Sequence, residues 1–338
     1  MVDRGYPVEL RDHRRAYSGS GRVDTPMGVS PGARRHPRLR RSWLVGYAFA
    51  APWLFGFFFL YLGPIALSFY YSLTDYSLLS SPRFVGLANY GKLLTDDPRF
   101  VATLYNSGYY TALSVPLYTA GALLTAMLLN HKLVGMRVFR TIYYLPAVVS
   151  GVSVAILWRW LLNPEFGLVN WLLSLVGIQG PGWLLSLDWA KPGFVLMHVW
   201  GLGTGMVIFL AGLQGIPRNL YDAAEMDGAN GWRKFWHVTV PMLSPTIFFV
   251  VVTESINSLQ VFTPAFIMSG SSVNTVGGPA DATLFYVLYL FLQGFVYFRM
   301  GYASAMAWIL FVLVLLLTLV QFALAGRWVY YEGNTRGA

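Results

Sequence analysis

The sequence predicts an all-α integral membrane protein with six transmembrane helices. The chain has 338 residues, of which 56% are hydrophobic and only 12% are charged, whereas about 25% are charged in a typical soluble domain. Long stretches without Asp, Glu, Lys or Arg recur, for example Ser42–Thr74, Phe100–His131 and Met300–Gly326. Because roughly 20 apolar residues in a helix cross a bilayer core of about 30 Å, these stretches are long enough to span a membrane.

The amino-terminal tail, residues 1–42, is polar and basic and is expected to be disordered. Residues 1–41 hold ten arginines among many Gly, Pro and Ser residues. We expect the basic cluster at residues 34–41 to act as a topology signal and to contact anionic lipid headgroups. Nucleic-acid binding is a remote alternative, because no folded basic module accompanies the cluster. The first apolar segment is too long for the core of a signal peptide and should remain as an anchor.

The remaining chain, residues 43–338, is predicted to form the transmembrane domain. Its spans are expected near residues 44–70, 104–130, 141–161, 192–214, 246–268 and 302–326. If the tail lies inside, 18 of the 24 Lys and Arg residues fall on inside segments. Positive residues favour the cytoplasmic side, so both termini are predicted to be cytoplasmic.

A rival seventh span occurs near residues 282–298. Only residues 299–301 separate it from the last span, and a seventh crossing would place the carboxyl terminus outside. We therefore expect an external helix that lies in the membrane interface or dips into the membrane, where its Tyr and Phe residues suit the boundary.

Prolines and glycines punctuate the predicted spans. Pro116 and Pro146 should bend the second and third spans, and their freed carbonyl groups must find partners on neighbouring helices. Gly201 and Gly205 form a GxxxG step in the fourth span, which favours close helix packing.

The loop at residues 217–245 is expected on the cytoplasmic side and is rich in Ala and Gly. Pro217 suits the first turn of a helix, Arg218–Asp227 contains good helix formers, and Arg218 can reach Asp222. Gly228 can supply a left-handed helix end. The pair Asn230-Gly231 predicts a turn, and Pro241 and Pro245 should mark the start of the fifth span.

The same loop resembles the EAA loop of permease subunits from bacterial ABC importers. That signature reads Glu-Ala-Ala, a nearby Gly, nine residues and Ile-x-Leu-Pro. Here it reads Asp222-Ala223-Ala224, Gly228, nine residues and Val238-Thr239-Val240-Pro241. The shorter side chain of Asp222 alters the reach toward a partner. The resemblance assigns ATPase coupling to Asp222, Ala223, Ala224, Asp227, Gly228 and Pro241.

Other segments resemble the first-permease branch of the sugar-type importers, which includes the maltose and glycerol-phosphate permeases. They include "FVGLANYGKLL" at residues 84–94 and "GYASAMAWILFVLVLLLTLVQF" at residues 301–322. The resemblance implies the type I ABC importer permease fold in a bacterial cytoplasmic membrane. It also implies four kinds of partner: a second permease in a heterodimer, two ATPase subunits, an extracytoplasmic solute-binding protein and a carbohydrate. The chain has no G-x-x-x-x-G-K-[ST] motif, so ATP and Mg²⁺ are expected in the ATPase subunits and no cofactor in this chain.

A polar group in the fifth predicted span is the candidate substrate path. At 100° per residue, Glu254, Asn257, Ser258 and Gln260 share an arc, and Phe262 lies near it. Carboxylate, amide and aromatic groups suit sugar hydroxyls and ring faces. Two alternatives remain open: a structural network of hydrogen bonds between helices, and the proton relay of a secondary transporter.

Charge favours a neutral cargo, and nothing predicts covalent chemistry. The predicted spans contain one basic residue, Arg159, and Glu254 would repel an anion, so a sugar is favoured over glycerol phosphate. The chain lacks cysteine, and His198 stands alone in the fourth span without a second ligand at helical spacing, so we expect it to be a packed residue. A membrane enzyme or a scaffold is disfavoured because no reactive cluster or large soluble domain is present.

Overall fold

The computed structural model describes residues 38–131, 134–270 and 276–330, which are mainly helical, as predicted. The chain divides into two units, Met1–Phe57 and Phe58–Ala338. In the first unit, helix α1 (Arg38–Gly56) contains Trp53, whose ring stacks on that of Phe57 with the centroids 5.5 Å apart. Residues 1–37 of the predicted tail lie outside the described residues, and its last residues belong to α1.

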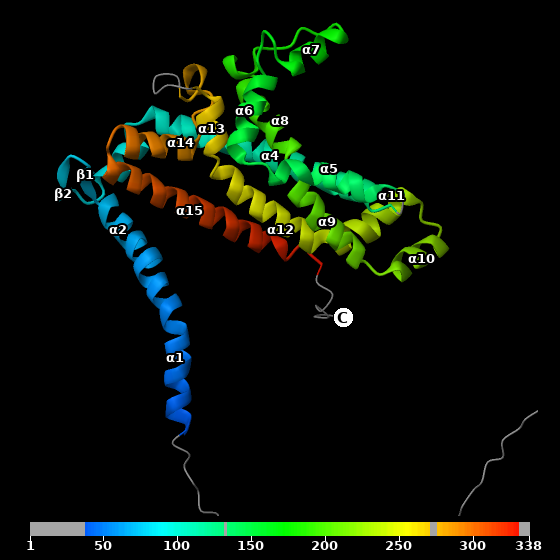
Figure 1. The fold of residues 1–338 in the computed structure, drawn as a ribbon, viewed down its shortest axis with the longest axis horizontal. Coiled ribbons are helices and arrows are strands. Elements are labelled where there is room, and N and C mark those ends of the chain that lie inside the picture. The colour runs from blue at the N-terminus through cyan, green and yellow to red at the C-terminus, as the bar shows by residue number, and fades with distance from the viewer. Residues whose placement is uncertain (1–37, 132–133, 271–275, 331–338) are drawn as a thin grey trace, which may run out of the picture. The chain divides into compact units, whose positions relative to one another are not determined.

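The remaining elements follow the order coloured in Figure 1, where η denotes a π-helix (η1, η3, η5) or a 3₁₀-helix (η2, η4). They are η1 (Phe57–Leu62), α2 (Gly63–Ser72), β1 (Thr74–Ser77), β2 (Ser80–Phe84), α3 (Ala88–Thr95), α4 (Pro98–Leu129), α5 (Met136–Val148), α6 (Gly151–Leu161), α7 (Leu168–Leu175), η2 (Trp183–Leu185), α8 (Ala190–Trp200), α9 (Gly203–Gly215), α10 (Arg218–Met226), α11 (Gly231–Lys234), η3 (Phe235–Thr239), α12 (Val240–Leu259), α13 (Thr263–Met268), η4 (Pro279–Asp281), α14 (Tyr286–Phe291), η5 (Leu292–Val296) and α15 (Met300–Ala325).

Six membrane spans are compatible with these helices in the described part of the chain. Four helical segments are long and apolar enough to cross a membrane: Val45–Ser72, Pro98–Leu129, Gly231–Leu259 and Met300–Ala325. Two helix pairs supply the others if each counts as one bent span, with an angle of 98° between α5 and α6 and of 47° between α8 and α9. The six predicted spans therefore correspond to four continuous helices and two bent pairs.

The bends and ends of the spans follow the prediction only in part. The third span bends near Pro146, as predicted, and its first helix α5 ends at Val148, two residues after the proline. Pro116, in contrast, lies inside the continuous helix α4. The fifth span begins at Gly231 instead of after the prolines of the loop, and α12 ends at Leu259, so that α13 forms a separate short helix.

Helix α4 is central to the second unit, where it packs against α8, α9, α12 and α14. The predicted close packing is confirmed at Gly205: a Cβ there would lie 2.8 Å from the Tyr118 ring, and the Gly205 N–H donates to the Tyr118 hydroxyl over 3.0 Å. Gly201 instead lies at the break between α8 and α9, because α8 ends at Trp200.

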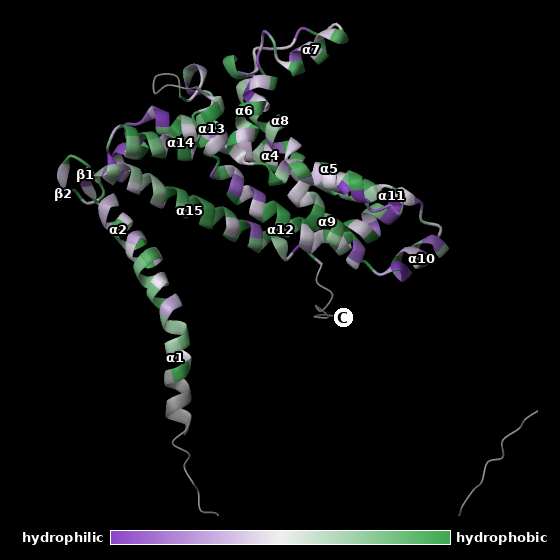
Figure 2. Cartoon of the chain, in the orientation of Figure 1, coloured by the Kyte–Doolittle hydropathy of each residue, from purple (hydrophilic) through white to green (hydrophobic). Residues whose placement is uncertain are grey.

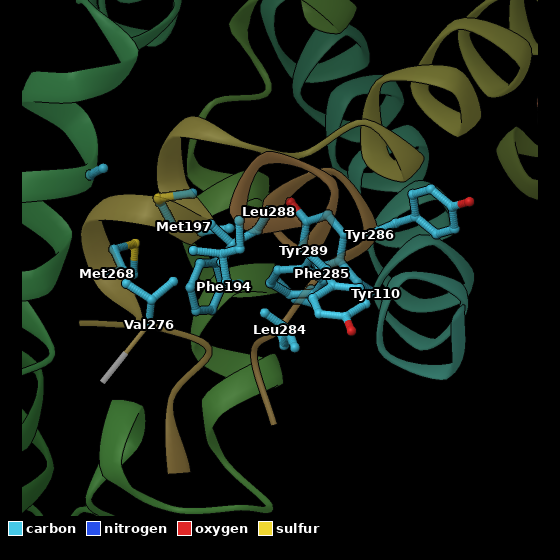
Figure 3. Packing of buried hydrophobic residues seen from close by; sticks show 14 of the residues in the cluster. Tyr110, Phe194, Met197, Met268, Val276, Leu284, Phe285, Tyr286, Leu288 and Tyr289 are labelled. Carbon is cyan, nitrogen blue, oxygen red and sulfur yellow. The ribbon is translucent and has the colours of Figure 1, made fainter. Parts of the chain in front are cut away.

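The larger hydrophobic core surrounds α14, as Figure 3 shows for Phe285, Tyr286 and Leu288. Helix α14 with η5 covers Tyr286–Val296, too short to be a seventh span. We expected its tyrosines to sit at the membrane boundary, but Tyr286 is buried and its hydroxyl donates to the Met306 carbonyl over 2.8 Å. Tyr286 and the equally buried Tyr289 therefore serve packing within the protein, whereas Phe295 in the same helix is exposed.

A two-stranded antiparallel hairpin, β1–β2, follows α2 and was not predicted. Helix α15 begins directly against it. A Cβ on Gly301 would lie 2.0 Å from the Thr74 carbonyl oxygen, so only glycine allows this approach of backbone to backbone. The hairpin and the start of α15 thereby form one wall of a polar hollow that is described below.

Candidate functional site

Helix α10 forms the predicted docking helix of the loop 217–245. It ends as expected: Gly228 adopts a left-handed conformation with φ of 77°. The Ala229 N–H donates to the Ala224 carbonyl over 2.9 Å, and the Gly228 N–H donates to the Glu225 carbonyl over 3.0 Å. These bonds satisfy carbonyl groups that would otherwise lack partners at the end of the helix.

Most of the predicted coupling residues are accessible. Asp222, Ala223, Asp227 and Gly228 are exposed, and Ala224 is half-buried. Figure 2 shows hydrophilic residues at α10 and a largely hydrophobic α15. Met226 adds an apolar side chain that is 85% exposed. The helix thus combines small residues, carboxylates and one flexible apolar side chain, a surface that another protein can approach closely.

Two contacts join α10 to the helix that follows it. The hydroxyl groups of Tyr221 and Thr239 lie 2.9 Å apart, and Lys234 Nζ lies 3.4 Å from Glu225 Oε2. The expected pair of Arg218 with Asp222 is absent among the described residues. The ion pair that does form links two helices instead of two turns of one helix.

The second half of the loop is helical and continuous with the fifth span. Asn230 caps α11 because its Oδ1 accepts a hydrogen bond from the Arg233 N–H over 2.9 Å. The helix then passes through η3 into α12, where Pro241 lies in the first turn. Pro241 is half-buried, like Ala224, whereas the other four predicted coupling residues are exposed.

Exposed tryptophans on this helix were missed as site residues. Trp232 and Trp236 are exposed, and their ring centroids lie 5.7 Å apart in an edge-to-face arrangement. Their spacing of four residues in "GWRKFWHV" places them on one side of a helix and could have indicated a shared surface.

The half-buried pair of Glu254 and His198 is the main polar feature of the predicted substrate path. Glu254 Oε2 lies 3.2 Å from His198 Nε2, with exposed side-chain fractions of 13% and 20%. The two atoms are within ion-pair distance, although the direction of the ring N–H does not meet hydrogen-bond geometry. The rings of Tyr110 and Tyr118 lie 5.9 and 5.0 Å from the imidazole ring. His198 is therefore packed, as expected, but it is not isolated.

The other predicted path residues do not share one environment. Asn257 and Gln260 are exposed, whereas Ser258 is buried, with its hydroxyl 3.0 Å from Thr111 Oγ1. Phe262 stacks on Phe266 at 5.8 Å and so belongs to an aromatic cluster. The structure thus places Glu254 beside His198, whereas the side-chain amides of Asn257 and Gln260 are exposed.

A structural hydrogen-bond network also involves α12. Gln321 Nε2 donates to Ser255 Oγ over 2.9 Å, and the Ser255 hydroxyl donates to the Val251 carbonyl over 2.6 Å. This hydrogen bond joins α12 to α15. It fits the alternative in which polar residues of the fifth span form a structural network of hydrogen bonds between helices. Among the described residues, no group of three His, Cys, Asp or Glu residues could hold a metal ion.

Comparisons with known proteins agree on the family. Residues 103–330 match the model of the family described as binding-protein-dependent transport system inner membrane component. The probable ABC transporter permease protein YesP of Bacillus subtilis is 41% identical over 298 residues, which cover 88% of this chain and 95% of YesP. The arabinooligosaccharides transport system permease protein AraP of the same organism is 32% identical over 283 residues, covering 83% and 88%.

A solved structure supports the fold. A chain of a bacterial ABC transporter for import of the acidic polysaccharide alginate aligns with a TM-score of 0.72 and 24% identity, covering 86% of this chain and 97% of that one. These relatives are permease subunits, which are non-catalytic, multi-pass membrane components. The chain belongs to the family of binding-protein-dependent transport system inner membrane components.

Proposed function

We propose that this chain is a permease subunit of an ATP-driven importer in a bacterial cytoplasmic membrane, and that it carries a sugar or oligosaccharide. Family membership supports the transporter class, and relatives named for arabinooligosaccharides, lactose, and trehalose and maltose support the cargo class. The subunit forms half of the translocation path, with a second permease as its heterodimer partner. Both termini lie in the cytoplasm in this proposal.

The exposure of helix α10 is the observation that supports coupling to an ATPase. It ends at a left-handed Gly228, and four of the six predicted coupling residues are exposed, so the helix can enter a cleft on an ATPase. Two ATPase subunits bind ATP and Mg²⁺, and their closure moves the spans through α10 and the helix at Gly231–Leu259. An extracytoplasmic solute-binding protein delivers the sugar, as supported by the related alginate transporter, described in complex with an alginate pentasaccharide-bound periplasmic protein.

Substitution of Gly228 tests this coupling. In Gly228→Val the positive φ of 77° is unfavourable for a β-branched residue, and the added bulk faces open space where a partner would dock. We expect sugar uptake and stimulation of the ATPase by the loaded binding protein to fall at least about tenfold, an effect of roughly 1.4 kcal/mol. Membrane insertion should remain normal. Gly91→Val, in open space without a positive φ, is the control. Normal coupling in Gly228→Val would reject the assignment.

We assign the Glu254–His198 pair to the path of a neutral sugar. A partly exposed carboxylate and imidazole beside tyrosine rings can bind hydroxyl groups, and the carboxylate disfavours an anion. Glu254→Gln should lower uptake of a neutral sugar, and the exposed Glu165→Gln should not. Normal sugar uptake by Glu254→Gln, or binding of glycerol phosphate alone by the purified complex, would contradict the assignment.

The same pair is the one observation that favours a proton-coupled secondary transporter. Two titratable side chains 3.2 Å apart could exchange a proton. Proteoliposomes decide between the two mechanisms: uptake that needs ATP and continues without a pH gradient supports the importer, whereas uptake driven by the gradient alone supports the alternative.

A further inference from the structure

A second polar site lies away from the Glu254–His198 pair. A hollow of about 540 Å³ is lined by residues of β1, α3, α14, η5 and α15 and by Asp96 and Asp97, which precede α4. Its volume falls in the range of ligand pockets, roughly 300–1,000 Å³. The charge distribution assigns the segments around it to the outer side, and nothing in the coupling mechanism uses it.

Gln293 lines the hollow, and the oxygen of its side-chain amide is unsatisfied. The residue is only 3% exposed, and its Oε1 has no hydrogen-bond partner among the described residues. A buried acceptor without a donor costs about 1–3 kcal/mol, so a hydroxyl or N–H group from a ligand would stabilise it. Gln293 lies in the π-helix η5, a type of turn that is often found at functional sites.

The wall around Gln293 is held in place by hydrogen bonds. The hydroxyls of Tyr289 and Tyr302 both donate to Asp97 Oδ2, over 2.8 and 2.6 Å, and Asp97 Oδ1 accepts from the Phe100 N–H over 3.1 Å. Tyr76 stacks on Tyr71 with centroids 4.6 Å apart, which fixes an aromatic ring beside the hollow. The site is therefore preformed.

The rim offers unpaired charges of both signs. Asp75, Asp96, Lys92 and Arg299 are exposed, and none of them takes part in an ion pair among the described residues. A simple anion or cation would be repelled by the rim charges of its own sign. A neutral molecule with many hydroxyl groups can instead donate to the carboxylates and accept from Lys92 and Arg299.

We propose that this hollow binds one or two rings of a neutral saccharide, with a hydroxyl group donating to Gln293 Oε1. A volume near 540 Å³ is large for a single lysine or arginine side chain from a docked protein and suits a small ligand. The choice of a sugar rests on the proposed function, but the site is separate from the Glu254 path and would hold sugar at the outer ends of α4 and α15.

Binding of free sugar to the complete permease–ATPase complex in nanodiscs, without binding protein, tests the proposal. Saturation-transfer difference NMR with maltose, lactose and arabinotriose as probes should detect binding of at least one sugar. Gln293→Leu should weaken it about tenfold, because the ligand hydroxyl loses its acceptor. Lys92→Ala, on the exposed rim and so harmless to folding, should weaken it severalfold, and the exposed Gln214→Leu is the matched control.

Several results would overturn the proposal. One is that none of the three sugars binds, and another is that both variants bind sugar as the unaltered complex does. A third is that the variants weaken only the affinity for the binding protein, which would make the hollow a protein contact. If coupling fails in Gly228→Val as expected while no sugar binds, the importer function stands and only the outer site is rejected.

Discussion

Helices α10 and α14 both interrupt the series of spans, yet different kinds of contact hold them. Helix α10 is largely exposed and is defined by its ends, above all by Gly228 with its positive φ. Helix α14 is buried, and distant residues fix it: Tyr286 bonds to Met306, and Tyr289 bonds to Asp97. The helix that we propose to dock on an ATPase is thus defined locally, whereas the helix that supports the bundle is defined by tertiary packing.

The largest effect on stability is expected at the buried helix. Asp97 caps α4 and accepts two tyrosine hydroxyls, so Asp97→Ala removes the cap and leaves both hydroxyls without their acceptor. We expect a loss of about 3 kcal/mol in the free energy of unfolding, measured by thermal denaturation of the purified complex. Asp96→Ala is the control, since Asp96 is exposed. Equal midpoints for the two variants would contradict the role of Asp97.

A smaller loss is expected for Tyr286→Phe. The substitution keeps the ring in the core but removes the hydroxyl that donates to the Met306 carbonyl over 2.8 Å. The cost should be about 1 kcal/mol, seen as a modest fall of the same thermal midpoint. Tyr105→Phe at an exposed ring should leave the midpoint unchanged. A fall as large as that of Asp97→Ala would show that the hydroxyl carries more than one contact.

The same contrast explains which features the sequence could predict. The end of α10 was predicted because Gly228 acts on its immediate neighbours. The hairpin β1–β2, the burial of Tyr286 and the Glu254–His198 pair were not, because each depends on residues far apart in the chain. Hydropathy located the six spans, and the prolines indicated where two of them should bend. The sequence did not distinguish Pro146, near which the third span turns by 98°, from Pro116, which lies inside the continuous helix α4.

At α10 we expect a local effect without global loss. In Gly228→Ala, a left-handed conformation costs about 1 kcal/mol for alanine, which should loosen the end of the helix. Hydrogen exchange of peptides covering residues 217–230 should become severalfold faster, while the thermal midpoint stays unchanged. Gly231→Ala, in open space without a positive φ, is the control. A lower midpoint in Gly228→Ala would mean that α10 is coupled to the core.

The smallest effect is expected for Asn230→Ala. The lost cap is worth about 1 kcal/mol to an isolated helix end, but the helix continues without interruption to Leu259, and the Tyr221–Thr239 contact holds α10 beyond the first turn. Only the amides of residues 232–234 should exchange faster, and Asn230→Asp should restore their protection. If hydrogen exchange also became faster across α10, then the start of α11 would help to position α10. In that case the contacts at the ends of α10 would not be sufficient to hold it.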